Sequence, residues 1–182
     1  IDKTPKKLEN EYYIIEYDNG LNITLKESGK KIFNAVSFDE IGDKGDSYVF
    51  IPAGQYRYPD NGFSKIEYES TPLVQKITVK NKLVTPERYD AKSGKRVGKA
   101  VNGISYTVAL KKGSRTIEIQ YDVENKACDH RIRILVDTAI VSEALYSDSA
   151  FSIDRHTPDE QCIYMNNFGG FCNSSFAMLW DG

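Results

Sequence analysis

The stretch FDEIGDKGDSYVF, residues 38–50, brings four carboxylates together within an otherwise hydrophobic run, namely Asp39, Glu40, Asp43 and Asp46. Carboxylate oxygens are the ligands that calcium prefers, but their spacing does not follow the D-x-[DN]-x-[DN]-G-x5-E pattern of the common calcium loop. Paired carboxylates also cleave glycosidic bonds, at separations of about 5 to 10 Å that the sequence does not fix. The third interpretation is a solvated turn, in which glycines permit positive φ and aspartates cap free backbone N–H groups. The residue pattern by itself favours the turn.

The two histidines of the chain, His130 and His156, are candidates for a metal site. A hydrolytic zinc site recruits two or more imidazoles with a carboxylate, for which Asp129 or Asp154 lies nearby in the sequence. Hydrogen-bonding residues at strand ends are the alternative, which the sparse pattern favours. Cys128 precedes His130 by two positions, but residues i and i+2 of a strand share a face without meeting in hydrogen-bond geometry. The sequence therefore does not indicate a cysteine nucleophile.

Arg131 and Arg133 alternate with isoleucines in the segment RIRIL, residues 131–135. On a strand this alternation places both guanidinium groups on one face, where we expect ion pairs with carboxylates of a neighbouring strand rather than an anion site. The chain also contains 12 tyrosines, whose rings with a polar tip suit sugar faces as well as the rims of a β-sandwich. We interpret most of them as packing residues.

The composition is that of an ordinary globular protein, with 182 residues, 40% hydrophobic and 27% charged. The formal net charge of -2 gives no sustained basic field for a phosphate backbone, so we expect no nucleic-acid partner. No segment approaches the roughly 18 apolar residues of a membrane helix, and the first residues lack the apolar centre of a signal peptide. The three cysteines show no C-x-x-C spacing, which argues against a disulfide framework and predicts a reducing, cytoplasmic setting.

The elements that would position these residues are almost all strands. Asp18-Asn19-Gly20 separates two segments rich in aromatic and β-branched residues and predicts a β-hairpin. In TIEIQYDV, residues 116–123, apolar and polar side chains alternate strictly, as in a strand with one buried face. The same alternation recurs in residues 65–70, 73–90, 104–124 and 131–140, with turns expected at Asn81, Ser93-Gly94 and Lys112-Gly113. No window sustains helical spacing with caps at both ends, although residues 138–147 could supply a short turn.

Around the acidic stretch we predict a strand in KIFNAVSF, residues 31–38, then a loop, then a strand in SYVFIP, residues 47–52, that Pro52 ends. A tyrosine-rich turn should follow in residues 53–62. Long strands with tight turns and one wet face each predict an all-β fold, a large antiparallel β-sandwich occupying residues 1–182 as one domain. The first residues lead directly into a strand and the last stop just after one, so we expect an excised fragment of a larger protein.

Two sets of markers occur in order along the chain. The first is the hairpin followed by the glycine-aspartate loop that ends in Tyr48, within residues 8–52; the second is DHRIRI, residues 129–134, followed by Ser147, Asp148 and Phe151. Together they resemble the C-terminal β-domain of family-38 glycoside hydrolases, the α-mannosidases, and their bacterial branch in particular.

The resemblance implies a fold similar to the galactose-mutarotase-like supersandwich. It also implies a retaining parent enzyme that hydrolyses terminal α-mannosides, with a zinc ion and an aspartate nucleophile in an N-terminal catalytic domain of the same chain. The fragment itself would hold no zinc and no catalytic residue and would be inactive alone. It would pack on the catalytic domain and lend a loop to the substrate cleft, with Asp43, Asp46 and Tyr48 lining the mannose subsite.

Two other functions stay open at the level of the sequence. A stand-alone carbohydrate-binding β-sandwich would use the tyrosines as a platform for sugar rings. A mutarotase-like activity would need a histidine and a carboxylate in one groove. The candidates for this acid–base pair are His130 with Glu143 or Asp154. The mannosidic linkage, the aglycone and the oligomeric state do not follow from the sequence.

Overall fold

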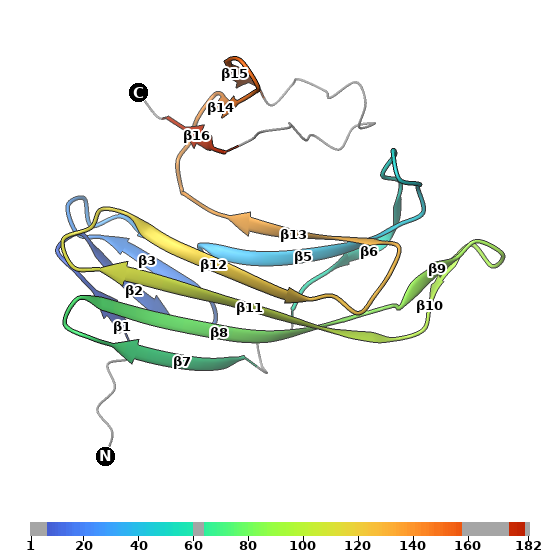
Figure 1. Cartoon of the computed structure of the whole chain (residues 1–182), viewed down its shortest axis with the longest axis horizontal. Helices are drawn as coiled ribbons and strands as arrows, with labels where there is room; N and C mark the ends of the chain where they lie inside the picture. The colour runs from blue at the N-terminus through green and yellow to red at the C-terminus, as the bar shows by residue number, and fades with distance from the viewer. Residues whose placement is uncertain (1–6, 60–63, 158–174, 181–182) are drawn as a thin grey trace. The chain divides into compact units, whose positions relative to one another are not determined.

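The computed structural model describes residues 7–59, 64–157 and 175–180, which form strands and turns but no helix (Figure 1). Accordingly, no helix among these residues has the length and apolar character needed to cross a membrane. The chain divides into two compact units, Ile1–Lys44 with Ile51–Asp137, and Gly45–Phe50 with Thr138–Gly182. The first unit contains β1 to β13, and the second contains β14 to β16.

The described residues of the first unit form three antiparallel sheets and a small hairpin. One sheet has the order β1-β2-β3-β4 and comprises β1 (Lys7–Glu9), β2 (Tyr13–Tyr17), β3 (Leu21–Leu25) and β4 (Lys31–Ile32). The largest has the order β12-β11-β8-β7 and comprises β7 (Lys65–Ser70), β8 (Val74–Thr85), β11 (Ala100–Lys111) and β12 (Ile117–Glu124). The third has the order β13-β5-β6 and comprises β5 (Val36–Asp43), β6 (Pro52–Arg57) and β13 (His130–Val136). The hairpin pairs β9 (Arg88–Asp90) with β10 (Lys95–Val97).

The second unit contains one small antiparallel sheet of order β15-β14-β16 among its described residues. It comprises β14 (Leu145–Asp148), β15 (Ile153–His156) and β16 (Ala177–Leu179). Part of the segment that could have supplied a short turn, residues 138–147, therefore lies in β14. Ser147 is buried in β14, and its hydroxyl is hydrogen-bonded to Nε2 of His156 over 2.9 Å.

The core of the first unit lies between the β12-β11-β8-β7 sheet and strands of the other two sheets. Successive residues of β11 alternate between buried and less buried, as expected for a strand with one wet face. Phe38 of β5 packs against Tyr106 of β11 and Tyr121 of β12, with ring centroids 5.9 and 6.0 Å away, and so joins two sheets. The buried apolar side chains of this core include Leu8, Ile15, Leu21, Ile23, Val36, Ile77, Val79, Leu83, Ile104, Val108 and Leu110. The predicted all-β, antiparallel sandwich is confirmed.

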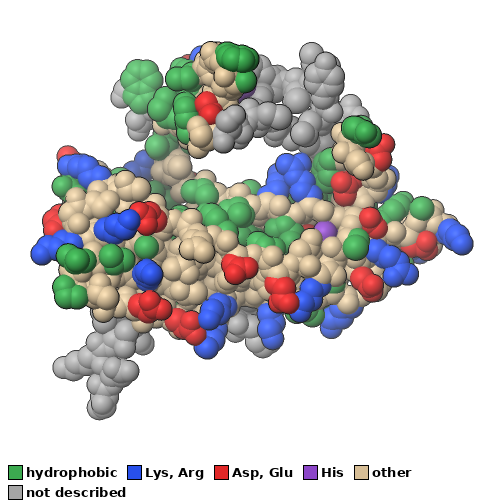
Figure 2. Space-filling view, in the orientation of Figure 1, with side chains coloured by type: hydrophobic (Ala, Val, Ile, Leu, Met, Phe, Trp, Pro, Cys, Tyr) green, Lys and Arg blue, Asp and Glu red, His purple; other side chains and the backbone are tan. Residues whose placement is uncertain are grey.

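Charged side chains of both signs are interspersed on the visible face of the molecule, as Figure 2 shows. Several form surface ion pairs, such as Glu67 with Lys65 and Lys80, each at 2.8 Å. Hydrogen bonds from Lys65 and Lys80 lower the pKa of Glu67 to about 2. This mixed surface accords with the formal net charge of -2.

Turns predicted from local residue chemistry are mostly where the sequence places them. Asn19 has a φ of 53° between β2 and β3, which confirms the first hairpin. Gly94 and Gly113 have φ values of 67° and 71° at two further turns. The turn expected at Asn81 is wrong, because Asn81 lies within β8 and pairs with Ile104 of β11. Its side chain is tolerated there because its Oδ1 accepts a hydrogen bond of 2.5 Å from the Ser64 hydroxyl.

The strand boundaries predicted around the acidic stretch are also wrong. β5 continues to Asp43, so Asp39 and Glu40 lie in a strand rather than in a loop. The segment 47–52 is a loop up to residue 51, and Pro52 begins β6 instead of ending a strand. Proline fits the first position of a strand at the edge of a sheet, which is where β6 lies. The expected tyrosine-rich turn is therefore strand as far as Arg57, and residues 60–62 of that expectation lie outside the described residues.

Candidate functional site

Three residues were predicted to line a sugar subsite: Asp43 ends β5, and Asp46 and Tyr48 follow in the loop that joins β5 to β6. Two hydrogen bonds close its base, because Lys44 N donates to Ile51 O over 2.8 Å and Ile51 N donates to Asp43 Oδ1 over 3.0 Å. The Asp43 carboxylate therefore holds the returning strand at the point where β6 begins.

Asp46 organises the tip of this loop. Its Oδ1 accepts hydrogen bonds from Tyr48 N over 2.8 Å and from Val49 N over 2.9 Å, and its own N–H donates to Val49 O over 3.1 Å. These bonds from the Tyr48 and Val49 N–H groups lower the pKa of the Asp46 carboxyl below its usual value. The aspartates thus cap backbone N–H groups, as the turn interpretation predicts.

Tyr48 follows Asp46 at the tip and is 92% exposed. The hydrogen bond from Tyr48 N to Asp46 holds the backbone, and the exposed ring and hydroxyl of Tyr48 are available to a partner. The three residues therefore differ in role: Asp43, at the end of β5, and Asp46 bind backbone N–H groups, and Tyr48 offers its side chain. Contact of any of them with a sugar stays a prediction.

Glycine has a role at this site that differs from the expected one. Neither Gly42 nor Gly45 has a positive φ. A Cβ atom on Gly42 would instead lie 2.6 Å from Ala53 O and would overlap the side chain of Arg96. Gly42 is therefore required by the close approach of an arginine, and the positive-φ part of the prediction is wrong.

Glu40 forms the centre of a buried ionic network rather than part of the loop. Its side chain is 0% exposed, and it accepts hydrogen bonds from His130 Nδ1 over 3.0 Å and from both terminal nitrogens of Arg96. Burial raises the pKa of Glu40, but the hydrogen bonds and charges of His130 and Arg96 lower it by more, so the net shift is downward. The carboxylate therefore remains ionised and ties β5 to β10 and β13.

Both ring nitrogens of His130 face acceptors. Nε2 lies 2.9 Å from Asn125 Oδ1, which also accepts a hydrogen bond from Ala127 N over 3.0 Å and is thereby identified as the amide oxygen. Glu40 at Nδ1 and Asn125 at Nε2 thus engage both ring nitrogens of His130. The strand-end, hydrogen-bonding role of His130 is confirmed, and neither nitrogen is left for the acid–base role considered with Glu143 or Asp154.

The histidines do not form the zinc site that was considered. His156 contacts Ser147, and among residues 7–59, 64–157 and 175–180 no group of three or more His, Cys, Asp or Glu side chains could hold a metal ion. The four acidic residues are likewise committed to cations or backbone N–H groups, so these side chains do not fit a resident metal.

The sequence matches the family described as the glycosyl hydrolases family 38 C-terminal domain over residues 8–181. The chain belongs to this family. The resemblance carried by the acidic loop and the DHRIRI segment is thereby confirmed. No curated protein matches the sequence.

Two solved structures share the fold of this family-38 C-terminal domain. A glycosyl hydrolase family 38 protein from Enterococcus faecalis has 20% identity and a TM-score of 0.75, and the match covers 86% of this chain and 21% of that one. An α-mannosidase from Enterococcus faecalis V583 has 20% identity and a TM-score of 0.80, with 94% of this chain and 22% of that one covered. The chain thus spans about a fifth of the length of these proteins.

The arginines of the DHRIRI marker serve the sheet of this family-38 domain. Arg133 pairs with Asp39 on the neighbouring β5 through Nε and Nη2, at 2.9 and 2.5 Å from the two carboxylate oxygens. Its guanidinium also lies over the Tyr56 ring, 4.9 Å from the centroid. The predicted cross-strand ion pair is confirmed for Arg133, and it explains why Asp39 is buried in a strand.

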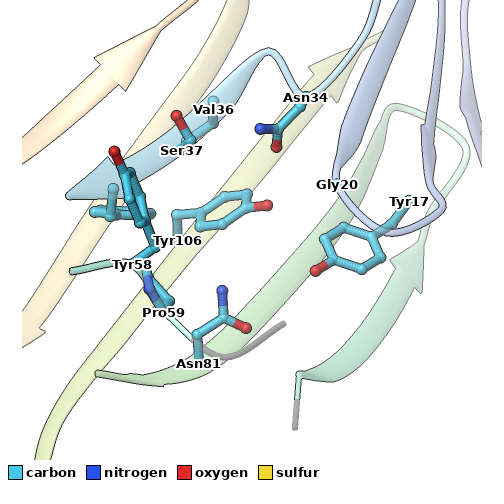
Figure 3. Close-up of a pocket in the computed structure, with 10 residues that line it drawn as sticks. Tyr17, Gly20, Asn34, Val36, Ser37, Tyr58, Pro59, Asn81 and Tyr106 are labelled. Carbon is cyan, nitrogen blue, oxygen red and sulfur yellow. The ribbon is translucent and has the colours of Figure 1, made fainter. Parts of the chain in front are cut away.

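The family-38 domain also contains a small cavity of about 220 Å³ that the sequence did not predict. The hydroxyls of Tyr17 and Tyr106 and the side-chain amides of Asn34 and Asn81 point toward this space (Figure 3). Burial raises the pKa of Tyr106, so its hydroxyl stays protonated and can donate. The residues come from four separate elements or connections, and no local pattern links them.

Proposed function

We propose that this chain is the non-catalytic C-terminal β-domain of a retaining, zinc-dependent α-mannosidase that hydrolyses terminal α-mannosides. Family membership over residues 8–181 supports a glycoside hydrolase, and the structure from Enterococcus faecalis V583 is described as an α-mannosidase. In this proposal the zinc ion and the aspartate nucleophile belong to a catalytic domain elsewhere in the same protein. This chain packs on that domain and supplies no catalytic residue.

The contribution of this chain to the substrate cleft is the loop of Asp43, Asp46 and Tyr48. The observation that carries this part of the proposal is that Tyr48 is 92% exposed on a tip whose backbone Asp46 caps. A fixed backbone reduces the entropy lost when the phenol engages a ligand. The hydroxyl can then hydrogen-bond a mannose hydroxyl while the ring excludes water from one side of the sugar.

Tyr48→Phe in the protein that carries this chain tests the proposal. Loss of one uncharged hydrogen bond of about 0.5–1.5 kcal/mol should reduce kcat/KM for an aryl α-mannoside by about 2- to 10-fold. Tyr48→Ala, which also removes the ring, should reduce kcat/KM further. Tyr12→Phe, which deletes a hydroxyl between β1 and β2, is the matched control and should leave kcat/KM unchanged. Equal kcat/KM values for wild type, Tyr48→Phe and Tyr48→Ala would refute the proposal that the loop lines the substrate cleft.

A stand-alone sugar-binding module is the second candidate. The cavity of Tyr17, Tyr106, Asn34 and Asn81 favours it, because convergent hydroxyls and amides are the groups that orient sugar hydroxyls. Titration of the chain with methyl α-mannoside, followed by tyrosine and Trp180 fluorescence, distinguishes the two functions. Saturable binding that Tyr106→Phe weakens and Tyr48→Ala does not would favour the module.

A further inference from the structure

A second cavity of the first unit, of about 490 Å³, has an entirely basic set of charged lining residues. It lies where the start of the β5–β6 loop and strand β6 meet the β9–β10 hairpin, elements that lie beside one another in Figure 1. The charged residues that line it are Lys44, Arg57, Lys95 and Arg96, and no carboxylate lines it. A cavity of this volume is within the usual range of about 300–1,000 Å³ for small-molecule sites.

The positive charge of this cavity is largely uncompensated. Arg96 is paired with Glu40, but Lys44, Arg57 and Lys95 form no ion pair with any residue in the described ranges. Three acids beside the lining segments accept hydrogen bonds from backbone N–H groups. Asp43 accepts from Ile51, Asp90 accepts from Lys92 and Ser93, and Asp129 accepts from Tyr89 over 3.0 Å.

Arg96 lies at the wall of this cavity and is paired with Glu40. Its side chain is only 8% exposed, and its Nε is the one buried side-chain nitrogen or oxygen among the described residues that has no hydrogen-bond partner. Buried donors of this kind are rare in native proteins, because they lose their water without gaining an acceptor. Arg96 lines the cavity beside Gly54, whose φ of 86° and missing side chain leave that wall open.

We propose that this cavity binds a phosphate group, or a similar multiply charged oxyanion, carried by a small organic molecule. The planar fork of Arg57 suits two oxygens of such a group, and Lys44 and Lys95 supply point charges that complete its neutralisation. Arg96, which Glu40 holds in place, adds a further positive charge at the wall of the same cavity. The volume exceeds that of a bare phosphate ion, so part of the organic carrier also fits, against the Tyr89 ring.

Isothermal titration of the protein that carries this chain tests the site, with inorganic phosphate and phenyl phosphate as probes and sodium chloride at equal ionic strength as the reference. We expect saturable binding of phenyl phosphate, and tighter binding of it than of inorganic phosphate. Arg57→Gln combined with Lys95→Gln should raise Kd at least tenfold. Lys82→Gln, which removes an exposed lysine from β8 outside the cavity, should change Kd less than twofold.

Gln55→Glu provides a second variant, because it adds a carboxylate to the cavity wall and removes none of its cations. It should weaken phosphate binding about as much as removal of one cation does. Circular dichroism of each variant checks that the fold is retained. The proposal is overturned if neither probe binds beyond the chloride reference, or if the cavity variants and Lys82→Gln alter Kd equally. The readout is binding, so it does not depend on whether the protein hydrolyses mannosides.

Discussion

Replacement of Glu40 by glutamine should destabilise the first unit strongly, because it leaves the buried guanidinium of Arg96 without its anion. Glu40 is 0% exposed, and the side chains of Arg96 and His130 are 8% and 2% exposed. Removal of one partner from a buried ion pair costs about 3–5 kcal/mol, since the remaining charge stays desolvated. Glutamine has nearly the same shape and leaves no cavity, so we assign the whole loss to charge. Because Arg96 remains 8% exposed, we take the lower end of this range, about 3 kcal/mol, as the expected loss.

Hydrogen–deuterium exchange of peptides covering β5, β10 and β13 measures this loss within the whole protein. A loss of about 3 kcal/mol corresponds to exchange more than about 100-fold faster at amides that open with this region. Glu118→Gln is the matched control, because Glu118 pairs with Lys111 on the surface and is 53% exposed. Surface pairs contribute about 0–1 kcal/mol, so exchange around β11 and β12 should barely change.

The pH dependence of the Glu40→Gln effect has a definite sign. The folded-state pKa of Glu40 lies below its ordinary value, so the carboxylate contributes stability above the unfolded pKa of about 4.3. That contribution is lost as the pH falls through the folded-state pKa. The difference between wild type and Glu40→Gln should therefore be constant near neutral pH and shrink below about pH 4. A difference under about 0.5 kcal/mol at pH 7, or one that grows on acidification, would refute this account of the network.

Two further substitutions test the loop and its support. Asp46→Ala should speed amide exchange at residues 48 and 49, whereas Asp46→Asn, which keeps an Oδ1 acceptor, should change it less. The pKa of Asp46 is lowered in the folded protein, so acidification through that pKa should weaken the cap in the wild type. Gly42→Ala should lower the free energy of unfolding by about 1–3 kcal/mol, because the new Cβ atom would overlap Arg96 and a backbone oxygen. Gly103→Ala should lower it less, because the nearest contact of its Cβ atom would be the flexible end of Glu124 at 3.3 Å. Slower exchange in Asp46→Ala, or equal losses in both glycine variants, would contradict these expectations.

The parts of the fold that the sequence predicts are those that neighbouring residues determine. The Asn19-Gly20 turn and the alternation of residues 116–123 are local signals, and the hairpin and β12 appear where they indicate. The boundary of β5 was missed because its cause is distant in the sequence. Glu40 is made acceptable in a buried strand by Arg96, 56 positions away, and Asp39 by Arg133, 94 positions away. Charge alone suggests a loop, and only the tertiary structure supplies the partners.

The same distance limits the prediction of the candidate sites. Tyr48 was singled out because a resemblance to a family marked its loop; it is exposed, and its contact with a sugar stays a prediction. The basic cavity was missed, since Lys44, Arg57 and Lys95 come from three separate segments with no common motif. Arg131 and Arg133 were considered for an anion site because they are close in sequence. The structure pairs Arg133 with Asp39 within the sheet.

The four acidic residues of the FDEIGDKGDSYVF stretch therefore divide into two pairs with different physical roles. Asp39 and Glu40 are held inside by cations from β13 and β10, and they fix the strand that leads into the loop. Asp43 and Asp46 bind backbone N–H groups and fix the loop itself. Because the inner pair anchors what the outer pair shapes, a substitution at Glu40 should disturb the presentation of Tyr48 without touching it. Faster amide exchange at residues 48 and 49 in Glu40→Gln would show this coupling, and exchange confined to β5, β10 and β13 would show that the loop is held by its own aspartates alone.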